Sequence, residues 1–471
     1  MRRALATWML VFLAGAAVAH ARDHKHKVKG HRSHGMRAFT HPGPSEAEVR
    51  AALEALRGGD GRLCTVAADR LGQGFWESGR QRLAGEEPLP ALGRGPVKNA
   101  EAIGLLGDAL GDPRACVRRA AATWLGDSQM PDALTRLTAG LRSPAPGTRE
   151  AAAFGLGVHG EGSGRDGLVA ALKDLTPAVA VAAAWALGRS EDLRNTPALK
   201  GALQHSDAGV RRAAAEALGS SQDPAALEAL LARRQDPDAS VRAAVASALG
   251  DIEDRKATPA LTALAKDKDP DVRTAALESL ARLEDPASLD VARAALTDAV
   301  PDVRHAALRA LASIEDPRTL PALSSALTDA EPEIRAEAAR ALGRLEDPKA
   351  ATALARATKD SVSDVRVVAV EALGELEGLG SAPAALLEAS SDTVAEVRAA
   401  AAEALRGFSR DEAATRRLTV LVRDQDRTVR RAAAEALVHL ESPEARAALR
   451  AALGDADSEV RRAAARGLGR D

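Results

Sequence analysis

The sequence predicts an all-α solenoid built from stacked two-helix repeats, and three observations carry this prediction. One position, almost always an Arg, recurs twelve times, with nine spacings of 31 residues and two of 32. Ala, Leu and Val follow that position at helical spacing. The 471-residue chain has five Phe, four Trp and no Tyr, which suits closely packed short helices better than a β-sandwich. The aligned positions are Arg118, Arg149, Ala180, Arg211, Arg242, Arg273, Arg304, Arg335, Arg366, Arg398, Arg430 and Arg461.

The first 21 residues (1–21) are typical of a Sec-type signal peptide. Arg2 and Arg3 form a basic start, residues 4–19 are apolar, and Ala19–Ala21 fits an A-x-A cleavage pattern. The apolar run is short for a membrane span, and no later stretch is long enough for one. We therefore expect an exported protein, periplasmic or extracellular, without a membrane span after cleavage. A retained anchor is the alternative.

Residues 22–44 form a polar segment rich in His and Lys that we expect to be disordered, because it lacks apolar periodicity. Its histidines could bind Zn²⁺, Cu²⁺ or Ni²⁺ weakly. Irregular spacing, a single carboxylate (Asp23) and neighbouring Lys residues favour a solvated basic tail that contacts polyanions, so no cofactor is expected. The weak metal candidates are His24, His26, His31 and His34.

Residues 45–111 are expected to hold a weak first repeat and the first helix of the regular array. An insertion at 74–99 breaks the period, and insertions in solenoids usually form loops. Its aromatic residues would dock it as an N-terminal cap, with a functional loop as the alternative. Cys64 and Cys116, the chain's two cysteines, fall in neighbouring repeats, and export permits a disulfide between them.

Residues 112–471 are predicted to form the array, each unit being two helices joined by tight turns. In "DPDVR" (Asp269–Arg273), Asp269 suits the N-cap and Pro270 the first helical position. Asp285 opens the other helix of the unit with the same chemistry. A glycine follows the Ala-Leu pair in several units and is predicted just beyond the helix end, at C′. These glycines are Gly219, Gly250, Gly343 and Gly374.

The pattern D-P-x-V-R-x-A-A-x-x-A-L-G, followed by a helix that Asp-Pro opens, resembles the short HEAT-like repeat of the phycobilisome-lyase type. The resemblance covers residues 112–471, with a weak unit near 45–72, and implies a right-handed α-solenoid of about 12–13 stacked HEAT-like repeats. Tetratricopeptide units would need Tyr, ankyrin units the motif T-P-L-H, and leucine-rich repeats an Asn ladder, which this sequence does not have.

The recurring Arg is expected to be structural. In HEAT-type repeats the Asp and Arg are understood to form a ladder between neighbouring units, and Arg273 directly follows the buried Val272 at the edge of the apolar stripe. A guanidinium there can donate to turn carbonyls and to a capping carboxylate. A row of arginines that binds anions is the alternative, although functional residues seldom recur in nearly every unit. The ladder is expected to break at Ala180.

The positions two and six residues after the buried Val slot vary between units and are predicted to form the recognition surface. Phe154 and Trp185 share the later slot in consecutive repeats, and Val181 occupies the earlier one. These residues would either form an exposed apolar ridge for a partner or pack both rings against neighbouring helices.

A second candidate is basic. His305, Arg309 and Arg340 gather on the equivalent face of later repeats, with Glu278 and Glu371 flanking them. They would form either a patch for an acidic partner or a solvated face whose charges pair with one another.

The sequence lacks the motifs of enzymes that share such repeats. It has no nucleophile elbow, P-loop or zinc helix, and no His followed by Glu, on which deoxyhypusine hydroxylase depends. Bilin lyases fit poorly with an export signal, and a net charge of −2 gives no basic field for nucleic acid. We therefore predict a non-catalytic scaffold that binds a protein partner through its inner helices. A tail that binds metal or polyanions, a bilin-lyase-like enzyme and a spacer without a ligand are the alternatives.

Overall fold

The computed structural model describes residues 43–58, 96–128, 130–160, 162–190, 192–314, 316–440 and 442–469. These residues belong to one compact unit, Gly43–Asp471. The predicted signal peptide, the four candidate metal-binding histidines and the insertion up to residue 95 lie outside the described residues. The regular elements in the described ranges are α-helices and short 3-10 turns, so the predicted all-α solenoid is confirmed.

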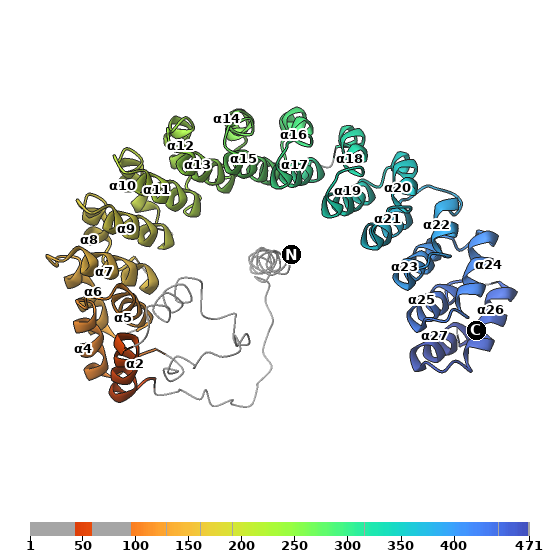
Figure 1. Cartoon of the computed structure of the whole chain (residues 1–471), viewed down its shortest axis with the longest axis horizontal. Helices are drawn as coiled ribbons and strands as arrows, with labels where there is room; N and C mark the ends of the chain where they lie inside the picture. The colour runs from red at the N-terminus through yellow and green to blue at the C-terminus, as the bar shows by residue number, and fades with distance from the viewer. Residues whose placement is uncertain are drawn as a thin grey trace, which may run out of the picture. The chain divides into compact units, whose positions relative to one another are not determined.

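Within this unit, longer and shorter helices alternate along the chain and form two layers (Figure 1). After α2 (Glu46–Gly58), the helices on the concave side, called the inner helices, are α5 (Ala115–Asp127), α7 (Pro146–His159), α9 (Pro177–Arg189), α11 (Ala208–Ser220), α13 (Ala239–Asp251), α15 (Pro270–Leu283), α17 (Pro301–Ser313), α19 (Pro332–Arg344), α21 (Ser363–Glu375), α23 (Ala395–Leu405), α25 (Arg427–Leu437) and α27 (Ser458–Leu468).

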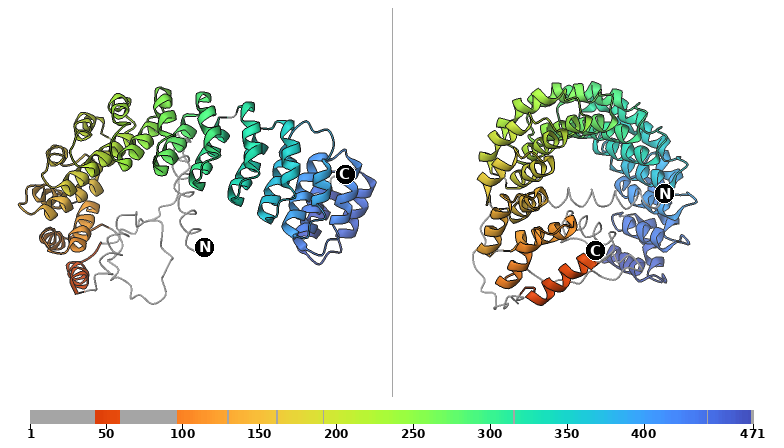
Figure 2. Two further views of the ribbon diagram at one scale, coloured as in Figure 1. Left: turned by 45° about the horizontal axis from the view of Figure 1, so that its top comes forward. Right: turned by 60° about the vertical axis from the view of Figure 1, so that its left-hand side comes forward.

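The outer helices cover the other side of the stack, and Figure 2 shows the two layers from two further directions. They are α4 (Ala100–Ala109), α6 (Pro131–Gly140), α8 (Arg165–Ala171), α10 (Thr196–Ala202), α12 (Leu227–Arg233), α14 (Thr258–Leu264), α16 (Leu289–Ala295), α18 (Leu320–Ala326), α20 (Ala351–Ala357), α22 (Ala384–Ala389), α24 (Glu412–Leu421) and α26 (Pro443–Ala452). Each inner helix packs on the neighbouring inner helices and on the outer helix of its own repeat. The inner helix α15, for example, packs on the inner helix α13 and on the outer helix α14.

Aspartates begin both kinds of helix. The Asp269 carboxylate accepts hydrogen bonds from the backbone N–H groups of Asp271 and Val272, so the predicted N-cap of α15 is confirmed. Asp285 also caps as predicted, accepting from Ala287 N–H, but it opens a 3-10 turn that leads into α16. The 3-10 turns are η1 (Leu193–Asn195), η2 (Pro224–Ala226), η3 (Arg255–Ala257), η4 (Pro286–Ser288), η5 (Pro317–Thr319), η6 (Pro348–Ala350) and η7 (Arg406–Phe408).

The core runs between the two layers as a continuous stripe of Ala, Leu and Val. In α11, Val210, Ala214 and Leu218 are fully buried, which matches the helical spacing of apolar residues in the sequence. Because each repeat buries its apolar face only against its neighbours, stability depends on contacts between adjacent repeats.

The prediction that glycines end the inner helices at C′ is wrong. Gly219, Gly250, Gly343 and Gly374 lie inside α11, α13, α19 and α21. Their role is close packing, because a Cβ built on Gly219 would lie 2.7 Å from the Cα of Ala248 in the next inner helix. The left-handed backbone that ends such a helix falls on other residues, for example Glu284 at φ 47° after α15.

Candidate partner-binding surface

The aligned arginines of the inner helices join consecutive repeats. In nine of them, Nε and Nη2 donate to the two oxygens of one Asp carboxylate in the turn that precedes the next inner helix, at 2.7–3.1 Å. This bidentate geometry is the strong form of a charged hydrogen bond. The pairs are Arg149–Asp174, Arg211–Asp236, Arg242–Asp267, Arg273–Asp298, Arg304–Asp329, Arg335–Asp360, Arg366–Asp392, Arg398–Asp424 and Arg430–Asp455.

The carboxylate in each pair is not the helix-capping Asp of the "DPDVR" motif. Arg273 pairs with Asp298, which lies 25 residues further along, whereas Asp269 caps α15. Nη1 of Arg273 donates to the backbone carbonyls of Asp267 and Lys268, in the turn before its own helix. Each arginine therefore ties its own turn to the turn of the following repeat.

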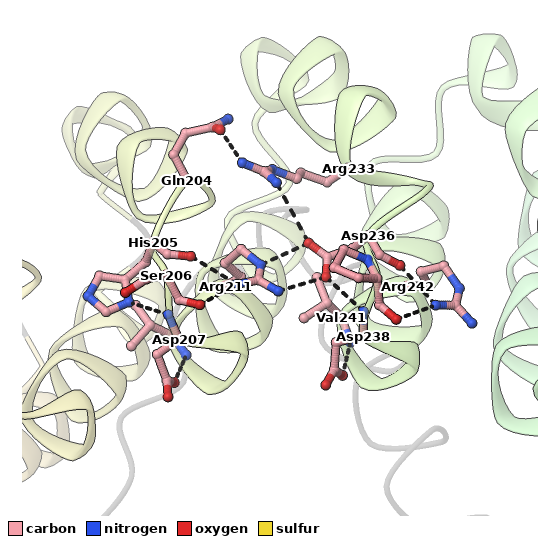
Figure 3. Close-up of polar contacts among 12 residues, drawn as sticks. Gln204, His205, Ser206, Asp207, Arg211, Arg233, Asp236, Asp238, Val241 and Arg242 are labelled. Carbon is pink, nitrogen blue, oxygen red and sulfur yellow. Dashed lines mark hydrogen bonds and ion pairs between the residues drawn. The ribbon is translucent and has the colours of Figure 1, made fainter.

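The most deeply buried of these pairs joins α11 to the turn before α13 (Figure 3). The side chain of Asp236 is 0% exposed and that of Arg211 is 10% exposed. Asp236 also accepts from the backbone N–H of Asp238 and lies 3.7 Å from Nη1 of Arg233. Burial alone would raise the pKa of the Asp236 carboxyl, but the hydrogen bonds from Arg211 and Asp238 outweigh it and hold that pKa below its ordinary value.

The ladder should make the array sensitive to acid. Hydrogen bonds from the paired arginines lower the pKa of Asp267, Asp360 and Asp424. A lowered pKa means that the stabilisation is complete above the unfolded value, about 3.9, and is lost as pH falls through the lower folded value. We expect the melting temperature to hold between pH 7 and 5 and to fall below about pH 4. Circular dichroism melting curves check this, and equal melting temperatures at pH 5 and pH 3 would contradict it.

Two gaps interrupt the ladder. Ala180 replaces the arginine in α9, and His205 stands where its carboxylate would be, so both partners are absent. At the other gap Arg118 remains, but Ser143 replaces the carboxylate. Arg461, in the last inner helix, donates only to the carbonyls of Asp455 and Ala456 among the described residues.

An aromatic column crosses three consecutive inner helices near the first gap. The rings of Phe154 (α7) and Trp185 (α9) stack with centroids 4.8 Å apart and planes 15° from parallel. The guanidinium of Arg119 (α5) lies 3.4 Å from the centroid of Phe154, and that of Arg189 lies 5.3 Å from the centroid of Trp185. One guanidinium therefore lies at each end of the stack of two rings, an arrangement that cation–π attraction favours.

The predicted ridge is exposed only in part. Phe154 is 4% exposed, because Arg119 covers one face of its ring and Trp185 the other, so this ring follows the packed alternative. Trp185 and Val181 are half-buried, and Arg189 is exposed. The accessible part of the column therefore consists of part of Trp185 with the two arginines.

The predicted basic patch is largely neutralised by its neighbours. Arg309 pairs with Glu278 of the preceding inner helix at 2.6 Å, and Arg340 pairs with Glu337 in its own helix at 2.7 Å. His305 is half-buried, and burial, together with the charge of Arg309, lowers its pKa. This face consequently presents paired charges.

Sequence reasoning named Glu371 only as a residue beside the basic patch and missed the acidic group to which it belongs. Glu371 and Glu375 on α21 and Glu403 on α23 are exposed. Burial and the nearby Glu403 raise the pKa of Glu371. The signal was available, since Glu371 and Glu403 occupy the slot that holds Phe154 and Trp185 in earlier repeats.

A groove of about 750 Å³ at the outer side of the early repeats was also missed. It lies beside the turn between α7 and α8, where Gly160, Gly162 and Gly164 take positive φ angles. Arg165 in its wall donates to Asn195 Oδ1 at 3.0 Å and to the Arg194 carbonyl at 2.7 Å. These contacts hold together a turn that departs from the Asp-Pro pattern of other repeats.

The remaining predicted sites are only partly within the described chain. Cys116 is buried at the start of α5 and is disulfide-bonded. Cys64 lies outside the described residues, so the pairing with it stays a prediction. Among the described residues, no group of three or more His, Cys, Asp or Glu side chains could hold a metal ion. Within the same ranges, no helix is long and apolar enough to cross a membrane.

Two-layer repeats joined by an Arg–Asp ladder define an α-helical repeat protein. Models of HEAT repeats match residues 90–157, 165–240, 230–312, 292–374 and 376–470. The chain belongs to the HEAT-repeat family, as the sequence pattern predicts. No curated protein matches the sequence.

Several solved structures are similar to this chain at low sequence identity. Kap121p is 15% identical with a TM-score of 0.51, and the match covers 90% of this chain and 52% of Kap121p. Kap95p, whose structure concerns its binding to RanGDP, is 14% identical with a TM-score of 0.50, covering 90% of this chain and 60% of that chain. The CpcE–CpcF complex of phycocyanin lyase from Nostoc sp. is 24% identical over 52% of this chain and 94% of that chain, with a TM-score of 0.33. This chain thus spans about half the length of Kap121p.

Proposed function

We propose that the chain is a non-catalytic scaffold that binds a protein partner through its inner helices, centred on the column of Arg119, Phe154, Trp185 and Arg189. The observation that carries this proposal is the column itself: two stacked rings and two guanidiniums on three consecutive helices. Trp and Arg are the residues most enriched at the energetic centres of protein interfaces. Kap95p, which shares the fold, binds RanGDP.

The column is the strongest candidate on the inner face because it combines rigidity with partial exposure. Phe154 is fixed beneath Trp185 and Arg119, so the accessible part of Trp185 would lose little side-chain freedom on binding. Many other charged positions of the inner face are matched in pairs, as Arg212 is with Glu216 at 2.8 Å and Arg309 is with Glu278. Exposed pairs of this kind contribute little binding energy.

Affinity capture from a native extract tests this proposal. Trp185→Ala should lose at least about 90% of the captured partner, as expected for an interface residue whose loss costs 1.4 kcal/mol or more. Val420→Ala is the matched control, because Val420 is 58% exposed on the outer helix α24. Arg189→Glu gives a second readout, because it reverses the charge at the exposed end of the column and keeps both aromatic side chains. Equal capture by the wild type and both inner-face variants would refute the proposal.

We further propose that the protein is exported, as its first 21 residues indicate, and that the segment 22–44 is not needed for partner binding. A tail that binds polyanions or metal ions is the competing function, supported by the histidines of that segment. Deletion of residues 22–44 separates the two: retained capture supports the inner surface, and abolished capture supports the tail.

A further inference from the structure

The ladder shows what an arginine in this position binds. In nine repeats, Nε and Nη2 hold a carboxylate of the next repeat, while Nη1 donates to carbonyls of its own turn. Arg118 keeps the second half of this pattern, donating through Nη1 to the carbonyls of Asp112 at 2.8 Å and Pro113 at 2.9 Å. No hydrogen bond joins its Nε or Nη2 to any described residue.

Ser143 occupies the position where the missing carboxylate would be. Its carbonyl accepts from Nη1 of Arg149 at 2.9 Å, as the carbonyl of Asp236 does from Arg242. Its Oγ accepts from Ala145 N–H at 3.2 Å, as the Asp236 carboxylate does from Asp238. The turn at Ser143 therefore makes the same backbone hydrogen bonds as the turns of the ladder but lacks their carboxylate.

The contrast with the other gap is informative. Where His205 replaces the carboxylate, the arginine is absent too, since Ala180 takes its place. At Arg118 the cation is kept although its anion is missing. The backbone also makes room for it, because a Cβ built on Gly147 would lie 2.7 Å from Cζ of Arg118.

Arg118 lines a pocket of about 260 Å³ between α5 and α7, and a second guanidinium lines it too. Nε of Arg119 is buried and has no hydrogen-bond partner among the described residues. Glu150 is the acidic residue of the lining, so the two arginines leave one positive charge in excess. The lining residues are Ala115, Cys116, Arg118, Arg119, Gly147, Glu150 and Ala151.

We propose that this pocket binds a carboxylate side chain from an acidic segment of a partner protein. Nε and Nη2 of Arg118 would hold the two oxygens as they hold Asp in the other repeats, and Arg119 would supply a second positive charge. Arg119 also covers Phe154, so the pocket adjoins the aromatic column. The inference rests on the proposed function and specifies the chemistry of the partner: acidic residues beside an apolar contact.

Substitution of Ser143 tests the proposal most sharply. Ser143→Asp restores the ladder carboxylate, so Arg118 would be satisfied within the chain. We expect a higher melting temperature together with at least about tenfold weaker binding of a labelled peptide of alternating Glu and Gly, measured by fluorescence anisotropy on the full chain. Arg118→Gln should weaken binding similarly. The same peptide with Gln in place of Glu is the ligand control.

Arg461→Gln is the matched protein control, because it removes the same charge from the other ladder arginine without a carboxylate partner among the described residues. Binding should change less than about twofold. Equal loss in Arg118→Gln and Arg461→Gln, equal binding of the Glu and Gln peptides, or unchanged binding by Ser143→Asp would overturn the proposal. None of these results would change the capture of a partner through Trp185. Rejection of the carboxylate pocket can therefore be distinguished from rejection of the proposed function.

Discussion

Arg211→Ala is expected to be the most destabilising single change in the ladder, lowering the free energy of unfolding by about 3–5 kcal/mol. It would leave the carboxylate of Asp236, which is 0% exposed, without its bidentate partner. Arg233, at 3.7 Å, offsets only part of that charge. Denaturant unfolding measures the total effect, and hydrogen exchange should show it concentrated in α11 and α13, because each repeat contacts only its neighbours.

Two variants make this prediction specific. Arg212→Ala removes an exposed neighbour on the same helix, paired with Glu216, and should change stability by less than about 0.5 kcal/mol. The double variant Arg211→Ala/Asp236→His copies the gap that the chain already tolerates at Ala180 and His205. It should be more stable than Arg211→Ala alone. A double variant as unstable as Arg211→Ala would show that the unpaired carboxylate of Asp236 is not what destabilises the single variant.

Gly219→Ala is the second large expected effect, a loss of about 1–3 kcal/mol. In an exposed helix interior the same change normally stabilises by up to about 1 kcal/mol, so the sign is diagnostic. Here the new Cβ would lie 2.7 Å from the Cα of Ala248 and 2.9 Å from its Cβ, which would force α11 and α13 apart. Thermal melting and denaturant unfolding measure the loss.

Gly201→Ala is the control for that experiment. Gly201 lies inside α10, and a Cβ built there meets nothing within 4 Å. We expect this variant to be stabilised by about 0.5–1 kcal/mol. Stabilisation of both variants would mean that the inner helices are not in close contact at Gly219.

The periodic features of the chain were predictable from sequence. Twelve units in register specify the repeat, and the Asp269 cap and the buried Val272 follow from local rules. The true partner of Arg273 was also visible in principle, because an Asp occurs six residues before most of the aligned arginines. Reading one repeat at a time hides such a pair, since Asp298 belongs to the next unit.

Features that depend on the distance between neighbouring inner helices were not predictable. Gly219 satisfies the rule for a helix end, and only the approach of α13 shows that it is a packing residue. The sequence left both exposure and packing open for Phe154, because its slot faces outward on a single helix. Arg119 of the preceding repeat covers it, and spacing within one unit gives no sign of this contact.

Hydrogen exchange of the chain with and without its captured partner tests the central claim most directly: the repeated Arg–Asp motif joins the repeats, and the variable inner face recognises the partner. We predict protection on binding in α5, α7 and α9, around Trp185, and little change in the outer helices α6, α8 and α10. Protection confined to the outer helices or to residues 22–44 would contradict this account.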